Sequence, residues 1–183
     1  KADTIIDFAH QARDMITDIH ESKYNYFDFK EYTMNNQKAK IESHMHKALE
    51  NNEFLVYLQP KYSITGENPV LNGAESLVRW RFKNERFIFP DAFIPTFEQN
   101  GFITELDMYM LEQTCIILRK WLDEGKKCVP VSVNQSRVNV FNSTYLTTLT
   151  EIIDKYEIPH ELLEFEITES AVMDDIGQVR EHL

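Results

Sequence analysis

The chain has 183 residues, enough for one domain or for one domain with part of another. Its content of 43% hydrophobic and 12% aromatic residues is typical of a globular protein with a core and excludes a disordered chain. The formal net charge of -11 argues against binding to a DNA or RNA polymer, because duplex phosphates need a basic surface. A small anionic ligand held by a few local cations remains compatible with this charge.

The sequence contains neither a signal peptide nor a run of about 20 apolar residues. We therefore expect a cytoplasmic segment without membrane contact, within a parent protein that can still have a membrane anchor upstream. The separation of Cys115 and Cys128 fits no metal site. Because Cys115 lies on the apolar face of a predicted helix, we expect a buried free thiol in a reducing compartment.

The first 52 residues predict two helices and a strand. Apolar residues recur at helical spacing over residues 2–17, and residues 24–29 favour a strand. One helix and one strand bury too little surface to fold alone, so we interpret residues 1–31 as the tail of a domain whose body lies upstream. Residues 32–52 predict a polar linker helix, on which His44 and His46 diverge and so do not favour a shared metal site.

From residue 53 onward, strands and helices alternate with short connections, which predicts parallel β/α units and an α/β fold. Pro60 is expected to end the first strand, and Gly125 the helix over residues 105–124. The expected strands are residues 54–58, a segment through residues 73–80, residues 129–134 and residues 162–169. The expected helices are residues 90–97, 105–124 and 145–156 and one that begins near Ser170.

The segment Gly73–Trp80 is largely apolar and contains one acid, Glu75, and one base, Arg79. A carboxylate on a strand that is otherwise buried is costly unless it meets a metal, an ionic partner or a ligand. Glu75 and Arg79 are four residues apart and therefore point to the same side of an extended segment. The segment alone favours an ion pair between them, and the alternative is that each binds part of one ligand.

Three strands of the parallel type are expected to end with an oxygen-bearing side chain, namely Glu75, Asn134 and Glu166. In a β/α barrel such groups gather at the carboxyl ends of the strands. Taken singly, Asn134 is better explained by a hydrogen bond to a loop, and Glu166 by exposure at a sheet edge, but three such residues in barrel order favour a shared site. Glu164 has the same parity as Glu166, so spacing alone leaves open which of them faces inward. Glu169 is interpreted as an acid at a helix start.

Two carboxylates and an amide oxygen form a hard ligand set of the kind that suits Mg²⁺ or Mn²⁺. The guanidinium of Arg79 can bind a phosphate through two hydrogen bonds. A metal site beside a phosphate-binding arginine predicts metal-assisted phosphodiester chemistry.

The order of these motifs resembles that of the EAL domain, the bacterial cyclic di-GMP phosphodiesterase family, over residues 53–183. The Glu-Ala-Leu that gives the family its name reads Glu75-Ser76-Leu77 here. Residues 2–29 resemble the last elements of a GGDEF (diguanylate cyclase-like) domain by pattern and position. The EAL resemblance is carried by Phe54-Leu55-Val56-Tyr57-Leu58-Gln59-Pro60-Lys61, by Gly73-Ala74-Glu75-Ser76-Leu77-Val78-Arg79-Trp80, by Phe89-Pro90-Asp91-Ala92-Phe93-Ile94-Pro95, by Gly101-Phe102-Ile103, by Ser132-Val133-Asn134 and by Glu166-Ile167-Thr168-Glu169-Ser170.

The resemblance implies a modified TIM-type (β/α) barrel that cleaves cyclic di-GMP to linear pGpG with two Mg²⁺ or Mn²⁺ ions. It implies that Glu75 is catalytic and that Glu75, Asn134 and Glu166 are metal ligands, which selects Glu166 over Glu164. It also implies that Arg79 binds a substrate phosphate and that Leu77 and Gln59 line the substrate pocket.

The family's paired aspartates, its later lysine and its glutamate-bearing loop would follow residue 183. We therefore expect the chain to be the first half of a barrel within a longer protein, inactive by itself and with an open sheet edge. We also expect a homodimer. The alternatives are a non-catalytic cyclic di-GMP receptor, which the retained metal ligands disfavour, and a purely structural fragment.

Overall fold

The computed structural model describes residues 2–14, 16, 24, 26–66, 68–83, 85–136 and 143–167. It divides into two compact units, Lys1–His44 and Met45–Leu183, and each is described by itself. In the described part of the chain, every helix is too short or too polar to cross a membrane.

The first unit contains α1 (Ala2–Asp14) and most of α2 (Phe29–Glu50), so both predicted helices are confirmed. The strand predicted over residues 24–29 is wrong, because the described residues before Phe29 are irregular and Phe29 opens α2. The Asp28 carboxylate accepts the backbone N–H of Lys30 at 2.7 Å and so caps the helix. Phe27 stacks on Phe8 of α1 with ring centroids 4.1 Å apart, which partly buries both aromatic rings without a sheet.

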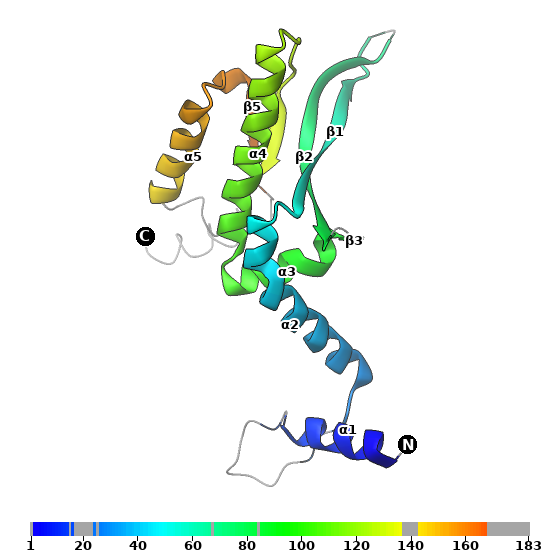
Figure 1. Cartoon of the computed structure of the whole chain (residues 1–183). Helices are drawn as coiled ribbons and strands as arrows, with labels where there is room; N and C mark the ends of the chain where they lie inside the picture. Colours follow the sequence, from blue (N-terminus) through cyan, green and yellow to red (C-terminus); the bar gives the residue numbers. More distant parts are fainter. Residues whose placement is uncertain are drawn as a thin grey trace, which may run out of the picture. The chain divides into compact units, whose positions relative to one another are not determined.

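The second unit is built on a five-stranded sheet, shown in Figure 1. The strand order is β1-β2-β4-β5, with β3 paired to the far end of β2. Strands β2, β4 and β5 are parallel, as the alternation of strands and helices predicted. The strands are β1 (Phe54–Ser63), β2 (Val70–Phe82), β3 (Arg86–Ile88), β4 (Val131–Asn134) and β5 (Leu163–Glu166).

Strand β1 departs from the expected run of parallel units, because it pairs with β2 in the antiparallel direction. Only residues 64–69 join the two strands, too few for a parallel crossover. Pro60 does not end β1 as predicted, but pairs with Ala74 inside the ladder. The Ala74 N–H donates to the Pro130 carbonyl at 2.9 Å, on the other side of β2. Within the described sheet β1 is an edge strand, so the missing N–H of Pro60 costs no ladder bond.

Helices α4 (Ile103–Asp123) and α5 (Ser143–Lys155) lie side by side against one face of the sheet (Figure 1). The helix predicted from apolar spacing over residues 105–124 is confirmed as α4, and it buries Leu111, Cys115 and Leu118 against Val131 and Val133 of β4. The Cys115 thiol is free and buried as expected, and burial raises its pKa to about 12. The remaining bounds are α3 (Pro90–Asn100) and a 3-10 turn (His160–Leu162).

A second part of the core is aromatic and joins the start of β1, the far half of β2 and α3. Phe54, Trp80, Phe93 and Phe97 are almost fully buried and contact one another at centroid distances of 5.0 to 6.0 Å. The indole N–H of Trp80 donates to the buried carboxylate of Glu53 at 3.0 Å. This cluster fixes the N-terminal strand pair to the helical layer and so orients the opposite face of β2.

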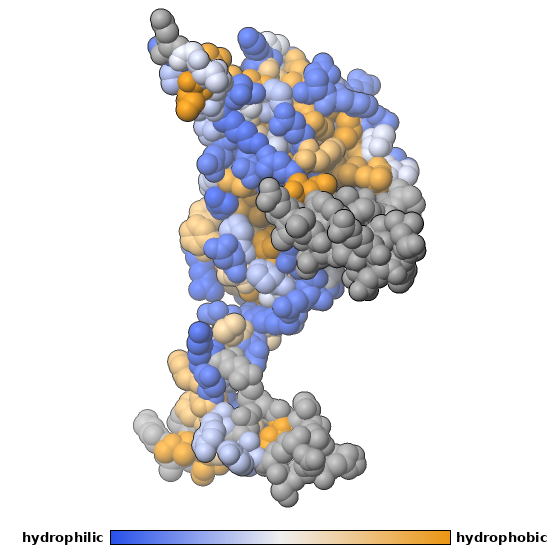
Figure 2. Space-filling view, turned by 180° about the vertical axis from the view of Figure 1, so that it is seen from behind, coloured by the Kyte–Doolittle hydropathy of each residue, from blue (hydrophilic) through white to orange (hydrophobic). Residues whose placement is uncertain are grey.

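The end of the β1–β2 hairpin is apolar and exposed. Ile64, Val70 and Leu71 are 80%, 62% and 43% exposed. The hairpin end lies at the upper left of Figure 2, where apolar surface is visible. The end of the hairpin therefore presents apolar side chains to solvent.

Candidate functional site

The functional residues of β2 are separated from its core residues by the alternation of the strand. Ser76 and Trp80 are buried on the helical side. Glu75, Leu77 and Arg79 are half-buried and belong to the opposite set of alternating positions. The prediction that Glu75 and Arg79 share one side of an extended segment is therefore confirmed.

Glu75 does not end its strand as predicted, because β2 continues to Phe82. The reason is that β2 has antiparallel partners beyond the short parallel region, with Trp80 opposite Ile88 of β3. Asn134 and Glu166 are the last residues of β4 and β5, as expected. Glu75 therefore reaches the site from the middle of its strand, whereas Asn134 and Glu166 reach it from the ends of theirs.

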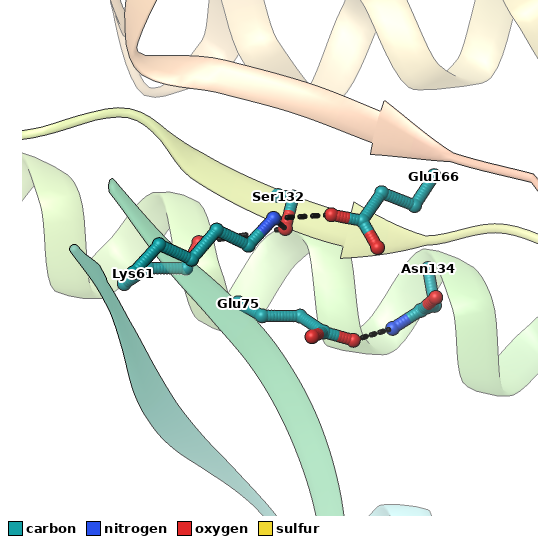
Figure 3. A network of polar contacts seen from close by, with 6 residues as sticks. Lys61, Glu75, Ser132, Asn134 and Glu166 are labelled. Atoms are coloured by element: carbon teal, nitrogen blue, oxygen red, sulfur yellow. Dashed lines mark hydrogen bonds and ion pairs between the residues drawn. The ribbon is translucent and has the colours of Figure 1, made fainter. Parts of the chain in front are cut away.

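Glu75 and Asn134 are in direct contact. The amide nitrogen Nδ2 of Asn134 donates to Oε1 of Glu75 at 2.9 Å, as Figure 3 shows. Asn134 is opposite Glu166 in the register of β4 and β5, so their side chains leave adjacent strands on one face. The parallel pairing thus brings the three predicted metal-binding residues to the same face of the sheet.

Glu75 and Arg79 contact other groups in the described part of the chain, and not each other. Arg79 Nη1 donates to the carbonyl of Val78 at 2.8 Å, and its guanidinium carbon lies 5.9 Å from the centroid of the Tyr57 ring. The ion pair that the segment alone favoured is therefore wrong. Gln59 is exposed and opposite Glu75 in the register of β1 and β2, next to the predicted site.

The structure adds Lys61, a residue that the sequence reasoning did not select. Its ammonium donates to Ser132 Oγ at 2.7 Å and forms an ion pair with Glu166 (Figure 3). The hydrogen bond to Glu166 raises the pKa of Lys61 above its ordinary value, and the same bond lowers the pKa of the Glu166 carboxyl. The sequence feature that could have identified Lys61 is its position two residues after Gln59, which places it on the same side of β1.

Glu164 and Glu166 differ in their surroundings although they share parity. Glu164 is exposed and opposite Ser132 in the register, whereas Glu166 is opposite Asn134 and half-buried by its contact with Lys61. Glu166 is therefore the acid of β5 that joins the polar network, which agrees with the resemblance-based choice between the two.

The donor chemistry of the site fits a hard divalent cation in part. Glu75, Asn134 and Glu166 offer carboxylate and amide oxygens, the ligands that Mg²⁺ and Mn²⁺ prefer. Across the described residues no group of three or more His, Cys, Asp or Glu side chains is close enough to hold a metal ion. The Nδ1 atom of His46 lies 3.6 Å from Oε2 of Glu105, and its ring packs edge-on against Phe102. These are the contacts of an exposed surface residue.

A cavity of about 420 Å³ lies between β2, the end of β4 and helices α3 and α4, and its lining includes Leu77 and Asn134 of the predicted site. It is mostly apolar and includes one buried carboxylate, that of Asp107. Asp107 accepts hydrogen bonds from the Ser136 N–H at 2.8 Å and from the Tyr145 hydroxyl at 3.5 Å. These contacts link α4 to the loop that directly follows Asn134 and to α5.

Comparisons with known proteins agree with this arrangement. The chain is 28% identical over 163 residues to the signaling protein YkoW of Bacillus subtilis, covering 89% of this chain and 20% of YkoW. It is 27% identical over 154 residues to MucR of Pseudomonas aeruginosa, a bifunctional diguanylate cyclase/cyclic di-GMP phosphodiesterase, covering 82% of this chain and 22% of MucR. It is 28% identical over 135 residues to the cyclic di-GMP phosphodiesterase PdeR of Escherichia coli, covering 74% of this chain and 20% of PdeR.

Solved structures show the same fold. The phosphodiesterase PaMucR in complex with c-di-GMP matches with a TM-score of 0.67 and 26% identity, over 76% of this chain and 56% of that one. The FimX EAL domain of Xanthomonas citri in complex with c-diGMP matches with a TM-score of 0.68 and 20% identity, over 79% of this chain and 55% of that one. The second match shows the fold alone.

The chain thus spans about a fifth of the curated relatives above and rather more than half of the solved chains. The EAL domain family model matches residues 42–183, starting inside α2. These matches confirm the expected α/β fold of the EAL type as a partial barrel, whereas the upstream GGDEF-like tail and the domain boundaries stay predictions. The chain belongs to the EAL domain family.

Proposed function

We propose that this chain supplies part of the active site of a phosphodiesterase that hydrolyses cyclic di-GMP to linear pGpG. The observation that carries the proposal is the convergence of Glu75, Asn134 and Glu166 on one face of the parallel strands. The relatives MucR and PdeR support it, since their names describe cyclic di-GMP phosphodiesterases.

In this proposal the oxygens of Glu75, Asn134 and Glu166 hold divalent metal, Mg²⁺ or Mn²⁺. Bound metal supplies Lewis acidity toward water and toward the phosphate oxygens. Of the two acids, Glu75 is the one whose removal lowers activity most, because it lies inside its strand and contacts Asn134 directly.

Arg79, Leu77 and Gln59 provide the proposed substrate contacts. Arg79 is held on the face of β2 by the Val78 carbonyl and the Tyr57 ring, and its remaining N–H groups can bind a phosphate of the ligand. Leu77 offers apolar surface between Glu75 and Arg79, and Gln59 offers an amide on the neighbouring strand. Arg79 and the metal-binding residues then bind two different parts of one substrate molecule.

We propose that the groups that complete the site come from parts of the protein outside this chain, and that the chain alone has negligible turnover. Both carboxylates of the described network are assigned to metal, so a further acceptor is needed for the proton of the attacking water. Measurable hydrolysis by the isolated chain would contradict this part of the proposal.

The test is hydrolysis of cyclic di-GMP with Mn²⁺ by the complete protein that contains this chain, with pGpG measured by chromatography. Glu75→Gln should lower turnover at least about 100-fold, as expected for loss of a metal ligand or its close support. Glu164→Gln removes the same charge from the same end of the sheet but from outside the network, and should keep most of the activity. Equal turnover by Glu75→Gln and the unchanged protein would refute the site assignment.

One observation favours a second function, a receptor that binds cyclic di-GMP without cleaving it. The ion pair between Lys61 and Glu166 already occupies one proposed metal ligand. In that case calorimetry would show tight binding of cyclic di-GMP without Mn²⁺ and no pGpG would form with it. Arg79→Ala should weaken binding under either function, because both use the same phosphate contact.

A further inference from the structure

Lys61 reaches across the sheet to the far side of the site. It starts on the edge strand β1, and its ammonium contacts Ser132 on β4 and Glu166 on β5 (Figure 3). Ser132 is completely buried and its hydroxyl also lies 3.4 Å from the carbonyl of Ala74. The ammonium is therefore fixed between a buried hydroxyl and a proposed metal ligand.

The path of the Lys61 side chain crosses β2 at a residue without a side chain. Gly73 is opposite Lys61 in the register, and a Cβ built on Gly73 would lie 3.8 Å from both Cβ and Cδ of Lys61. The same Cβ would lie 3.3 Å from the Pro130 carbonyl oxygen, which is a tight contact. Gly73 thus leaves the lysine stem in contact with the bare strand while β2 stays close to the chain that leads into β4.

The charges of this face explain why the lysine is stable there. Glu75 and Glu166 belong to the network, and Glu164 is nearby on β5. Arg79 is engaged by Val78 and Tyr57, so in the described part of the face Lys61 is the cation that touches a carboxylate. The face thus carries three carboxylates and one bound ammonium. Its negative charge is therefore partly balanced even without a metal ion.

We infer that Lys61 is a positioning residue that occupies the Glu166 carboxylate in place of a metal ion and gives way when metal binds. The inference rests on the proposed function, because it takes Glu166 as a metal ligand. A Glu166 oxygen that receives the ammonium cannot at the same time offer that lone pair to a dication. A fixed positive charge this close also repels the dication, so Lys61 lowers the affinity of the site for metal.

The test is the affinity for Mn²⁺, measured through the electron paramagnetic resonance signal of free Mn²⁺ in titrations of the complete protein. Lys61→Met keeps the length of the side chain and removes its charge, and should tighten Mn²⁺ binding about tenfold or more. Lys61→Arg keeps the charge and should stay within about twofold of the unchanged protein. The matched control is Lys155→Met on α5, which removes the same charge from a lysine paired with Glu112, and should leave the affinity unchanged.

A gain in affinity cannot come from misfolding, so the expected result is not open to that explanation. Unchanged or weaker Mn²⁺ binding by Lys61→Met overturns the inference, provided that Glu75→Gln still weakens binding and so locates the metal at this site. If neither the unchanged protein nor Lys61→Met binds Mn²⁺ in a way that depends on Glu75, the metal site of the proposed function fails, and the inference fails with it. The two failures therefore give different results.

Discussion

The buried carboxylate of Asp107 should make the stability of the domain depend on pH in a way that can be measured. Asp107 lies on α4 and is only 7% exposed. Burial raises its pKa from 3.8 to about 6, although hydrogen bonds from Ser136 and Tyr145 act in the opposite direction. We expect the carboxyl to be largely protonated in the folded state at pH 5 and ionised at pH 7.

The sign of the effect follows from the number of protons bound in each state. Between pH 3.8 and about 6 the folded state holds the Asp107 proton and the unfolded state has lost it, so the free energy of unfolding falls as the pH rises. The two pKa values differ by 2.2, which corresponds to about 3 kcal/mol because each pKa unit is worth about 1.4 kcal/mol. The stabilisation is fully present below pH 3.8 and is lost as the pH rises through 6.

The assay is urea unfolding of the unchanged chain and of Asp107→Asn at several values between pH 4 and pH 7. The amide oxygen of asparagine can still accept the Ser136 N–H, so the substitution removes the titration and keeps this contact. The stability of the unchanged chain relative to the variant should fall by about 2.4 kcal/mol over this range, since the unfolded state is already partly protonated at pH 4, with most of the change below pH 6.

Asp91→Asn is the matched control, because Asp91 is an exposed aspartate in the first turn of α3, and its difference should vary by less than about 0.5 kcal/mol. A difference for Asp107→Asn that stays flat between pH 4 and pH 7, or that grows with pH, would refute the reasoning from burial.

Three further substitutions test local features by urea unfolding at pH 7. The buried hydroxyls of Ser76 and Thr114 are 3.0 Å apart, so Ser76→Ala should cost about 1 kcal/mol, and less in a Thr114→Ala background; equal costs in both backgrounds would show that the contact contributes nothing. Gly101 has a φ of +83° with nothing within 4 Å of an added Cβ, so Gly101→Ala should cost about 1 kcal/mol through backbone strain alone, whereas Gly66→Ala should be near neutral. Leu118 is fully buried on α4, so Leu118→Ala should cost about 2 to 5 kcal/mol, and a smaller loss would mean that the core closes around the cavity.

Patterns of burial were predictable from the sequence because they repeat locally. The apolar spacing that predicted α4 needs only the period of a helix, and the structure buries Leu106, Met110, Leu111, Cys115 and Leu118 along it. The parity of β2 likewise separated Glu75 and Arg79 from the buried side chains. Local periodicity therefore predicted which face of each element carries polar groups.

Features that depend on partners distant in the sequence were missed or wrong. Pro60 continues its strand because β1 is an edge, and Glu75 lies inside its strand because β3 extends the pairing of β2. The aromatic run before α2 has the composition of a strand, but Phe27 packs on α1 instead. Lys61 became part of the site only through contacts with β4 and β5, which no spacing within β1 encodes.

Each carboxylate in the polar network of this face is satisfied by an N–H donor of the chain itself. Asn134 presents its amide nitrogen to Glu75, and Lys61 presents its ammonium to Glu166. A metal ion would need the amide oxygen of Asn134 and would compete with the ammonium for Glu166, so both contacts would have to change together. The free energy of metal binding is then reduced by the loss of these two contacts, by up to about 1 kcal/mol for each because both pairs are partly exposed to solvent. Tight metal binding therefore requires that substrate or further ligands offset this cost, so metal affinity should rise when cyclic di-GMP is bound.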